Sequence, residues 1–129
     1  MKAVLSIAAG LILSFSLASC ERDDPDPVAG KGGNAILKVT PQHHGKNIDS
    51  CTIYIKYNAQ DKPATFDDSV KCVMEGGKPV ATFSGLKKGK YYLFGFGWDP
   101  SIGMNVKGGA PYTITQESTQ SYNLAVTED

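Results

Sequence analysis

The two histidines are the first residues to consider for metal binding or acid–base chemistry. His43 and His44 are adjacent in the loop that follows the first predicted strand, and Asp49 comes shortly after them. A metal ion needs side chains that converge on one point, whereas neighbouring side chains in an extended loop point apart. No Cys-x-x-Cys or His-x-x-x-His spacing in the sequence supports these residues. We therefore expect two solvated loop histidines and no metal site.

The acidic and hydroxyl side chains show no spacing typical of an active site. Asp61, Asp67 and Asp68 share one polar loop, but their order matches no calcium-binding loop. The serines lie in no nucleophile elbow, and no glycine-rich phosphate loop follows a strand and opens a helix. A domain this small also offers little room for a catalytic cleft. The sequence predicts a protein without catalytic activity and without a cofactor.

Three aromatic side chains form a pattern that favours a binding surface. Phe94, Phe96 and Trp98 alternate along one predicted strand, so they share the face opposite its core-type residues. If those core-type residues point inwards, the three rings point outwards and mark a contact surface for a glycan or a protein. The alternative is that the following loop, residues 101–112, packs over the rings and buries them.

Residues 1–19 have the features of an export signal. Lys2 supplies a positive charge, and an uncharged run rich in Leu, Ile and Ala follows. This run is shorter than the roughly 20 apolar residues that a spanning helix needs, and Ser and Gly interrupt it. It ends in Leu17-Ala18-Ser19-Cys20, which resembles the lipobox of bacterial lipoproteins. In that family the signal peptide is cleaved before the cysteine, which then carries acyl chains.

The lipobox resemblance implies that Cys20 is lipidated and anchors the protein to a membrane. One acyl chain binds a bilayer weakly, and each buried CH₂ adds about 0.8 kcal/mol. Two or three chains on Cys20 would therefore make the attachment effectively permanent. The alternative is an ordinary signal peptide, after which Cys20 stays unmodified and pairs with another cysteine.

Residues 20–33 are predicted to form a flexible acidic tether, because Asp, Glu, Pro and Gly dominate them without apolar periodicity. The acids that begin at Glu21 resemble the signal that takes Bacteroidota lipoproteins to the outside of the outer membrane. This resemblance implies a lipid-anchored protein that faces the cell exterior. The alternatives are a position on the periplasmic face and an acidic segment that serves only as a solvated spacer.

Cys51 and Cys72 are the two thiols that remain once Cys20 is acylated. An exported chain meets an oxidising compartment, and both cysteines share the strand parity of apolar neighbours. A disulfide between them would close a loop of about 22 residues and stabilise the fold by about 3 kcal/mol on the chain-entropy account. The alternative is a pair of buried free thiols that pack as small hydrophobic side chains.

The rest of the 129-residue chain has the pattern of an all-β domain. Its 13 basic and 13 acidic side chains leave no basic surface for nucleic acid. Apolar residues alternate with a period of two in seven segments, 35–40, 51–57, 70–74, 80–83, 91–96, 112–114 and 122–126. Turn-forming residues separate these segments, and no amphipathic helix is evident. Residues 34–129 are therefore predicted to form an antiparallel β-sandwich of about seven strands.

Residues 81–93 resemble the prealbumin-like, or transthyretin-like, sandwiches, which include carboxypeptidase regulatory-like domains. An apolar strand leads to Gly85-Leu86, then to the turn Lys87-Lys88-Gly89, and then to Lys90-Tyr91-Tyr92-Leu93. The resemblance implies that Leu86 caps the core and that Tyr91 and Leu93 re-enter it. An immunoglobulin-like sandwich with another strand order is the alternative.

These patterns together predict a non-catalytic cell-envelope lipoprotein that presents one sandwich for non-covalent contacts at the cell surface. Its partners would be the membrane, through Cys20, and a protein or glycan. A glycan-binding accessory module that uses Phe94, Phe96 and Trp98 is the first alternative. A fimbria-associated subunit is the second, although polymerising pilins of the prealbumin-like type generally carry two domains.

Overall fold

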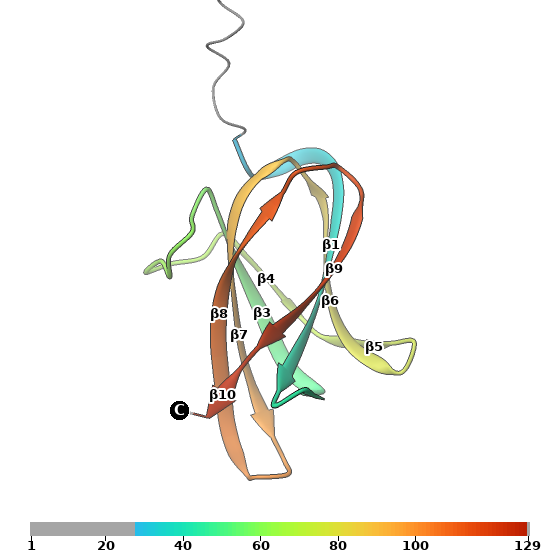
Figure 1. The fold of residues 1–129 in the computed structure, drawn as a ribbon, viewed down its shortest axis with the longest axis vertical. Coiled ribbons are helices and arrows are strands. Elements are labelled where there is room, and N and C mark those ends of the chain that lie inside the picture. Colours follow the sequence, from blue (N-terminus) through green and yellow to red (C-terminus); the bar gives the residue numbers. More distant parts are fainter. Residues whose placement is uncertain (1–27, 129) are drawn as a thin grey trace, which may run out of the picture.

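The computed structural model describes residues 28–128, so the predicted signal peptide and Cys20 lie outside the described residues. The strands are β1 (Lys31–His43), β2 (Lys46–Asn47), β3 (Ser50–Tyr57), β4 (Asp68–Lys71), β5 (Val73–Glu75), β6 (Lys78–Leu86), β7 (Gly89–Asp99), β8 (Met104–Ile114), β9 (Thr119–Ala125) and β10 (Thr127–Glu128). Figure 1 shows these strands, and the described residues contain no helix that could span a bilayer.

The strands form two sheets, which confirms the predicted all-β sandwich. One sheet has the order β2-β1-β6-β5, with β9 beside β1, and the other has the order β10-β8-β7-β3-β4. Strand pairs are antiparallel except β1 and β9, which run parallel from Ile36↔Thr119 to Gln42↔Ala125. We refer to the sheet that contains β7 as the β7 sheet.

The core between the sheets follows the alternation read from the sequence. In β3 and β7 every second side chain is buried, and Ile53, Ile55, Tyr91 and Leu93 have no exposed surface. Full burial of an aliphatic side chain of this size contributes about 1.5–3 kcal/mol. The period of two therefore selects both the strands and the faces that they turn inwards.

The predicted strand 70–74 is wrong, because it is two strands in different sheets. β4 pairs with β3, β5 pairs with β6, and Cys72 lies between them where the chain crosses. Met74, which has the same strand parity as Cys72 in the sequence, is 57% exposed on β5. Alternation cannot reveal such a crossing, since each short strand keeps a period of two while the sheet changes.

The predicted loop 101–112 is also wrong, because most of it is β8. This strand pairs with β7 along its whole length, from Met104 to Ile114. A Gly-Gly pair is typical of a turn, but Gly108 and Gly109 lie within β8, and close packing accounts for both glycines. A Cβ atom at Gly108 would lie 2.3 Å from the carbonyl oxygen of Ala125, and one at Gly109 would lie 2.5 Å from the hydroxyl of Tyr92.

One end of the sandwich, which we call the near end, is where the described chain begins, and Tyr91 fixes it there. The Tyr91 hydroxyl donates to the carbonyl of Lys87 at 2.7 Å and accepts from the N–H of Gly30 at 2.9 Å. A Cβ atom at Gly89 would lie 2.8 Å from Ala29, so only glycine allows this approach. β1 starts at Lys31, directly after these contacts and before residue 34, where the predicted domain begins.

The opposite end of the sandwich, which we call the far end, is set by the length of β1. This strand has 13 residues, so at about 3.3 Å per residue its two ends lie at most about 40 Å apart. His43 ends β1 at the far end, where β10 and the turn between β7 and β8 also lie (Figure 1). The far end therefore gathers chain segments that are distant in sequence.

Candidate functional site

His43 is buried at the far end, so the prediction of two solvated loop histidines is wrong for this residue. Its side chain is 5% exposed. His43 pairs with Lys46 across β1 and β2, and the loop between them is His44-Gly45. His44 has a φ of 53° and Gly45 a φ of 77°. Positive φ at both loop residues is the signature of a type I′ hairpin turn.

This turn explains why the two histidine rings converge. Neighbouring side chains point apart along an extended chain, but the reversal at His44 brings the two rings to a centroid distance of 4.3 Å. His44 itself remains exposed. In the sequence, the pair His44-Gly45 could have indicated this hairpin turn, because histidine tolerates positive φ better than most residues.

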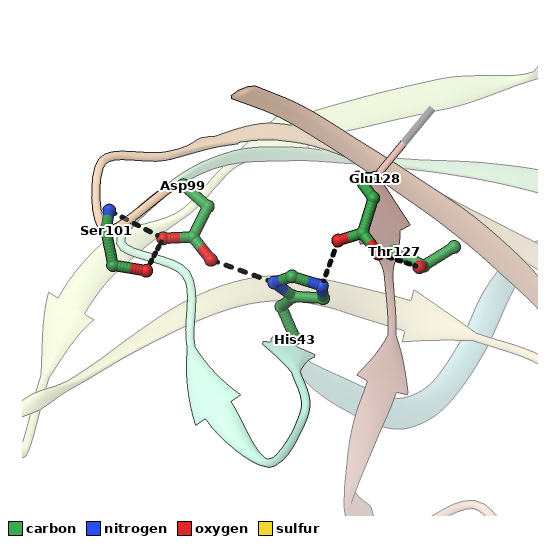
Figure 2. Close-up of polar contacts among 5 residues, drawn as sticks. All are labelled: His43, Asp99, Ser101, Thr127 and Glu128. Atoms are coloured by element: carbon green, nitrogen blue, oxygen red, sulfur yellow. Dashed lines mark hydrogen bonds and ion pairs between the residues drawn. The ribbon is translucent and has the colours of Figure 1, made fainter. Parts of the chain in front are cut away.

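Both ring nitrogens of His43 face carboxylates (Figure 2). Nδ1 lies 2.8 Å from Oδ2 of Asp99, and Nε2 lies 2.7 Å from Oε2 of Glu128. Asp99 ends β7 and is 2% exposed, whereas the Glu128 side chain on β10 is 41% exposed. Ser101 donates its N–H at 2.9 Å and its hydroxyl at 2.6 Å to Oδ1 of Asp99. We call His43, His44, Asp99 and Glu128 the far-end cluster.

The carboxylates set the charge state of this cluster. The hydrogen bond to Asp99 raises the pKa of His43 above 6.5, against the lowering effect of burial, and Glu128 raises it further. Hydrogen bonds from Ser101 and His43 lower the pKa of Asp99 to about 2. Asp99 is therefore ionised near neutral pH and accepts the proton on Nδ1, which leaves Nε2 to bind a second proton or another cation.

The cluster does not have the geometry that activates a serine nucleophile. In a Ser-His-Asp triad the histidine receives the serine proton and the aspartate orients the histidine. Here the Ser101 hydroxyl donates to Asp99 and not to His43. The arrangement instead holds the His43 ring by its Nδ1 side and turns Nε2 towards Glu128 and His44.

The structure places Phe94, Phe96 and Trp98 on the outer surface of the β7 sheet. Phe96 is 41% exposed and Trp98 is 44% exposed. The segment 101–112 leaves these two rings open, because it continues the same sheet as β8. We call Phe96 and Trp98, with the neighbouring Phe94, the aromatic face.

Phe94 differs from the other two rings because the 58–67 segment covers part of it. Phe66 stacks on Phe94 at a centroid distance of 5.8 Å, and Tyr54 lies 6.4 Å away. The Lys62 ammonium lies 4.5 Å from the Phe94 centroid, within cation–π range. Phe96 and Trp98 therefore make up the open part of the aromatic face.

A shallow hollow of about 250 Å³ lies beside the open rings. Phe96 and Trp98 line it together with the polar side chains of Ser50, Thr52, Lys71 and Asn105. A hollow of about 500 Å³ opens at the near end, where its charged lining residues are Lys88 and Lys90. Phe96 and Trp98 line the smaller hollow, whereas Phe94 lines neither of the two.

The structure also brings Cys51 and Cys72 together. They face each other at the end of the β3–β4 pairing, where the Cys72 N–H donates to the Cys51 carbonyl at 2.9 Å. Both side chains are buried, and their sulfur atoms are not joined in this structure. The hydrogen bond between the two thiols, together with burial, raises the pKa of Cys51. The disulfide remains a prediction, and the facing positions provide the proximity that it requires.

No protein-family model matches this chain, and neither the curated proteins nor the solved structures include a match. The features of the described residues that bear on function are therefore the aromatic face and the far-end cluster.

Proposed function

We propose that the protein is a non-catalytic binding module of the cell envelope, anchored through lipid on Cys20, and that the aromatic face is its contact surface. The observation that carries this proposal is the exposure of Phe96 and Trp98 beside a hollow with polar walls. Large apolar side chains are costly to leave in water, and when grouped they are typical of interaction sites.

The position of the aromatic face supports the same proposal. Trp98 pairs with Ser50 and Asn105, next to the residues that close the far end. The first described residues, which are the ones nearest to Cys20 in the sequence, lie at the near end. A module tethered there would hold Trp98 away from the membrane, where a partner outside the bilayer can reach it.

The surroundings of Trp98 favour a glycan over a protein as the ligand. A sugar ring has a flat C–H face that packs on an aromatic ring, and hydroxyl groups at its edge that need hydrogen-bond partners. Phe96 and Trp98 offer the flat surface, and Ser50, Lys71 and Asn105 offer the polar groups. A typical protein–protein interface buries about 800 Å² on each partner. Because Phe66 covers part of Phe94, only Phe96 and Trp98 remain open on the aromatic face for such an interface.

The prealbumin-like relationship belongs to this proposal as well. In its favour, Leu86, Tyr91 and Leu93 are fully buried, as the resemblance requires. The chain also reverses between β6 and β7 through Lys87-Lys88, at the place where the resemblance puts the turn.

The test of the contact surface is a chain that carries both Phe96→Ala and Trp98→Ala. We expect wild type to be retained by at least one polysaccharide in a pull-down panel and the double variant to be lost from it. Met74→Ala is the matched control, since this side chain is 57% exposed on the other sheet. Equal retention of wild type and double variant would contradict the assignment of the face, and retention of neither wild type nor control by any polysaccharide would contradict the glycan.

The test of the anchor is Cys20→Ala in the native host. We expect the wild type in the membrane fraction and the variant in the soluble fraction, because two or three acyl chains hold a protein far more firmly than one. Equal membrane partitioning of the two proteins would contradict lipidation at Cys20.

A further inference from the structure

We propose that the far-end cluster is a binding site for Zn²⁺ or a similar divalent transition metal, with His43, His44 and Glu128 as ligands. One ligand atom from each residue lies within 4.8 Å of the other two. Two imidazoles and a carboxylate form a donor set that suits Zn²⁺, and three protein ligands leave one coordination position for water. This inference does not depend on the proposed function.

The strongest observation is the environment of His43 Nε2. This atom is buried and makes no well-formed hydrogen bond within residues 28–128, although Oε2 of Glu128 lies 2.7 Å away. With the Nδ1 proton directed at Asp99, a neutral ring would turn a lone pair towards a negatively charged oxygen. That arrangement is repulsive unless Nε2 binds a second proton or a metal cation. A divalent metal satisfies both groups at once.

Asp99 provides the support that metal-bound histidines usually have. A ligating imidazole generally donates its other N–H to a carboxylate or a carbonyl, which fixes the tautomer and the ring orientation. Asp99 accepts from His43 Nδ1 at 2.8 Å, and two hydrogen bonds from Ser101 hold Asp99 in place. The metal-facing nitrogen is therefore oriented by a rigid, buried partner before any metal binds.

The remaining two ligands are able to adjust. Zn²⁺ binds nitrogen and oxygen at about 2.0–2.2 Å, so tetrahedral ligand atoms lie roughly 3.3 Å apart. His43 and Glu128 are closer than this, and the widest separation in the group reaches 4.8 Å at most. His44 and Glu128 are exposed, so rotation of their side chains can supply shifts of this size without moving the buried His43.

The test is a calorimetric titration of the untagged full chain in detergent with zinc chloride. We expect one Zn²⁺ per chain, and we expect His44→Asn and Glu128→Gln each to weaken binding by about 10-fold or more. Asparagine keeps the positive φ that the hairpin turn requires, so His44→Asn should fold normally. Glu75→Gln is the matched control, because Glu75 is an exposed glutamate on β5 that pairs with Lys38. Its affinity for Zn²⁺ should equal that of wild type.

A second measurement separates this site from the cysteines. With Co²⁺ in place of Zn²⁺ we expect visible absorption bands of a four-coordinate nitrogen and oxygen site, without a thiolate charge-transfer band. Asp99→Asn should weaken binding by about 10–100-fold, since it removes the support of His43. The proposal is overturned if wild type shows no saturable binding, if His44→Asn binds as tightly as wild type, or if a thiolate band appears.

Discussion

The two ends of the sandwich are closed by different chemistry. At the near end a neutral side chain, Tyr91, fills the space, and main-chain groups of Gly30 and Lys87 satisfy its hydroxyl. At the far end His43 and Asp99 fill the space, and other ionisable or hydroxyl side chains satisfy them. Both solutions bury a ring and use its polar atoms. The two ends differ in whether pH and bound cations can change how much these contacts stabilise the fold.

This difference separates structural from conditional contributions. The near end holds its partners by shape and by neutral hydrogen bonds, so its stabilising effect should be nearly constant with pH. The far end holds its partners by charge, so its effect should vary with protonation and with bound cations. We expect mutations at the near end to lower the free energy of unfolding by the same amount at every pH and metal concentration. Mutations at the far end should change how the free energy of unfolding depends on pH and on bound metal.

The largest effect is expected at the near end. Tyr91→Ala should lower the free energy of unfolding by about 3–5 kcal/mol, because it leaves a cavity in a fully buried site. Tyr91→Phe keeps the ring and removes the hydroxyl, so it should cost about 1–3 kcal/mol through the unpaired N–H of Gly30. Urea unfolding monitored through Trp98 fluorescence measures both values. A cost for Tyr91→Phe as large as that for Tyr91→Ala would show that the ring contributes nothing beyond its hydroxyl.

The next effect concerns Cys51 and Cys72, which lie nearer the far end than the near end. If they are bonded, alkylation of the unfolded, unreduced protein should label neither thiol, and reduction should lower stability by about 3 kcal/mol. Mass spectrometry before and after reduction distinguishes the two states. Complete alkylation without reduction would show that the facing thiols remain free, and that the far end has no covalent support.

Much of this fold is predictable from the sequence, and the reasons are local. The alternation in β3 and β7 identifies the buried Ile53 and Leu93, and the same alternation places Phe96 and Trp98 outside. The paired glycines at Gly76-Gly77 identify the turn between β5 and β6, where both have positive φ. Each of these features depends on neighbouring residues alone.

The features that the sequence did not predict depend on distant segments. Gly108 looks like a turn residue until the carbonyl of Ala125 is placed against it. The far-end cluster joins the end of β1, the end of β7 and β10, so its residues meet only when three strand registers are known. Strand periodicity determines which face a side chain occupies but not which strands end together. A buried histidine with two carboxylates is therefore not visible in the sequence.

A smaller effect is expected from pH at the far end of the metal-free protein. The raised pKa of His43 stabilises the fold fully below pH 6.5, and this contribution is lost as the pH rises through the folded-state pKa. The lowered pKa of Asp99 stabilises the fold above pH 3.8, and this contribution is lost as the pH falls through about 2. The pair should therefore stabilise the fold most between pH 3.8 and pH 6.5.

The measurement for this prediction is urea unfolding of wild type and Asp99→Asn in EDTA, from about pH 3 to about pH 9. The difference in free energy of unfolding between wild type and Asp99→Asn should be greatest between pH 3.8 and pH 6.5 and should shrink towards alkaline pH. Glu128 and Lys46 also act on the pair, and both residues are present in the two proteins compared. Tyr91→Phe is the control, and its cost should stay constant. A difference for Asp99→Asn that does not vary with pH would remove the distinction between the two ends.

The smallest effect on the fold is expected from His44→Asn. His44 is exposed, and asparagine suits the first position of a type I′ turn at least as well, so stability in EDTA should change by less than about 0.5 kcal/mol. Saturating Zn²⁺ should then separate the proteins, because a ligand at 100 times its dissociation constant stabilises by about 2.7 kcal/mol, and the variant should gain much less. If His44→Asn instead destabilises the metal-free protein by more than about 1 kcal/mol, then His44 stabilises the metal-free fold itself, as Tyr91 does at the near end.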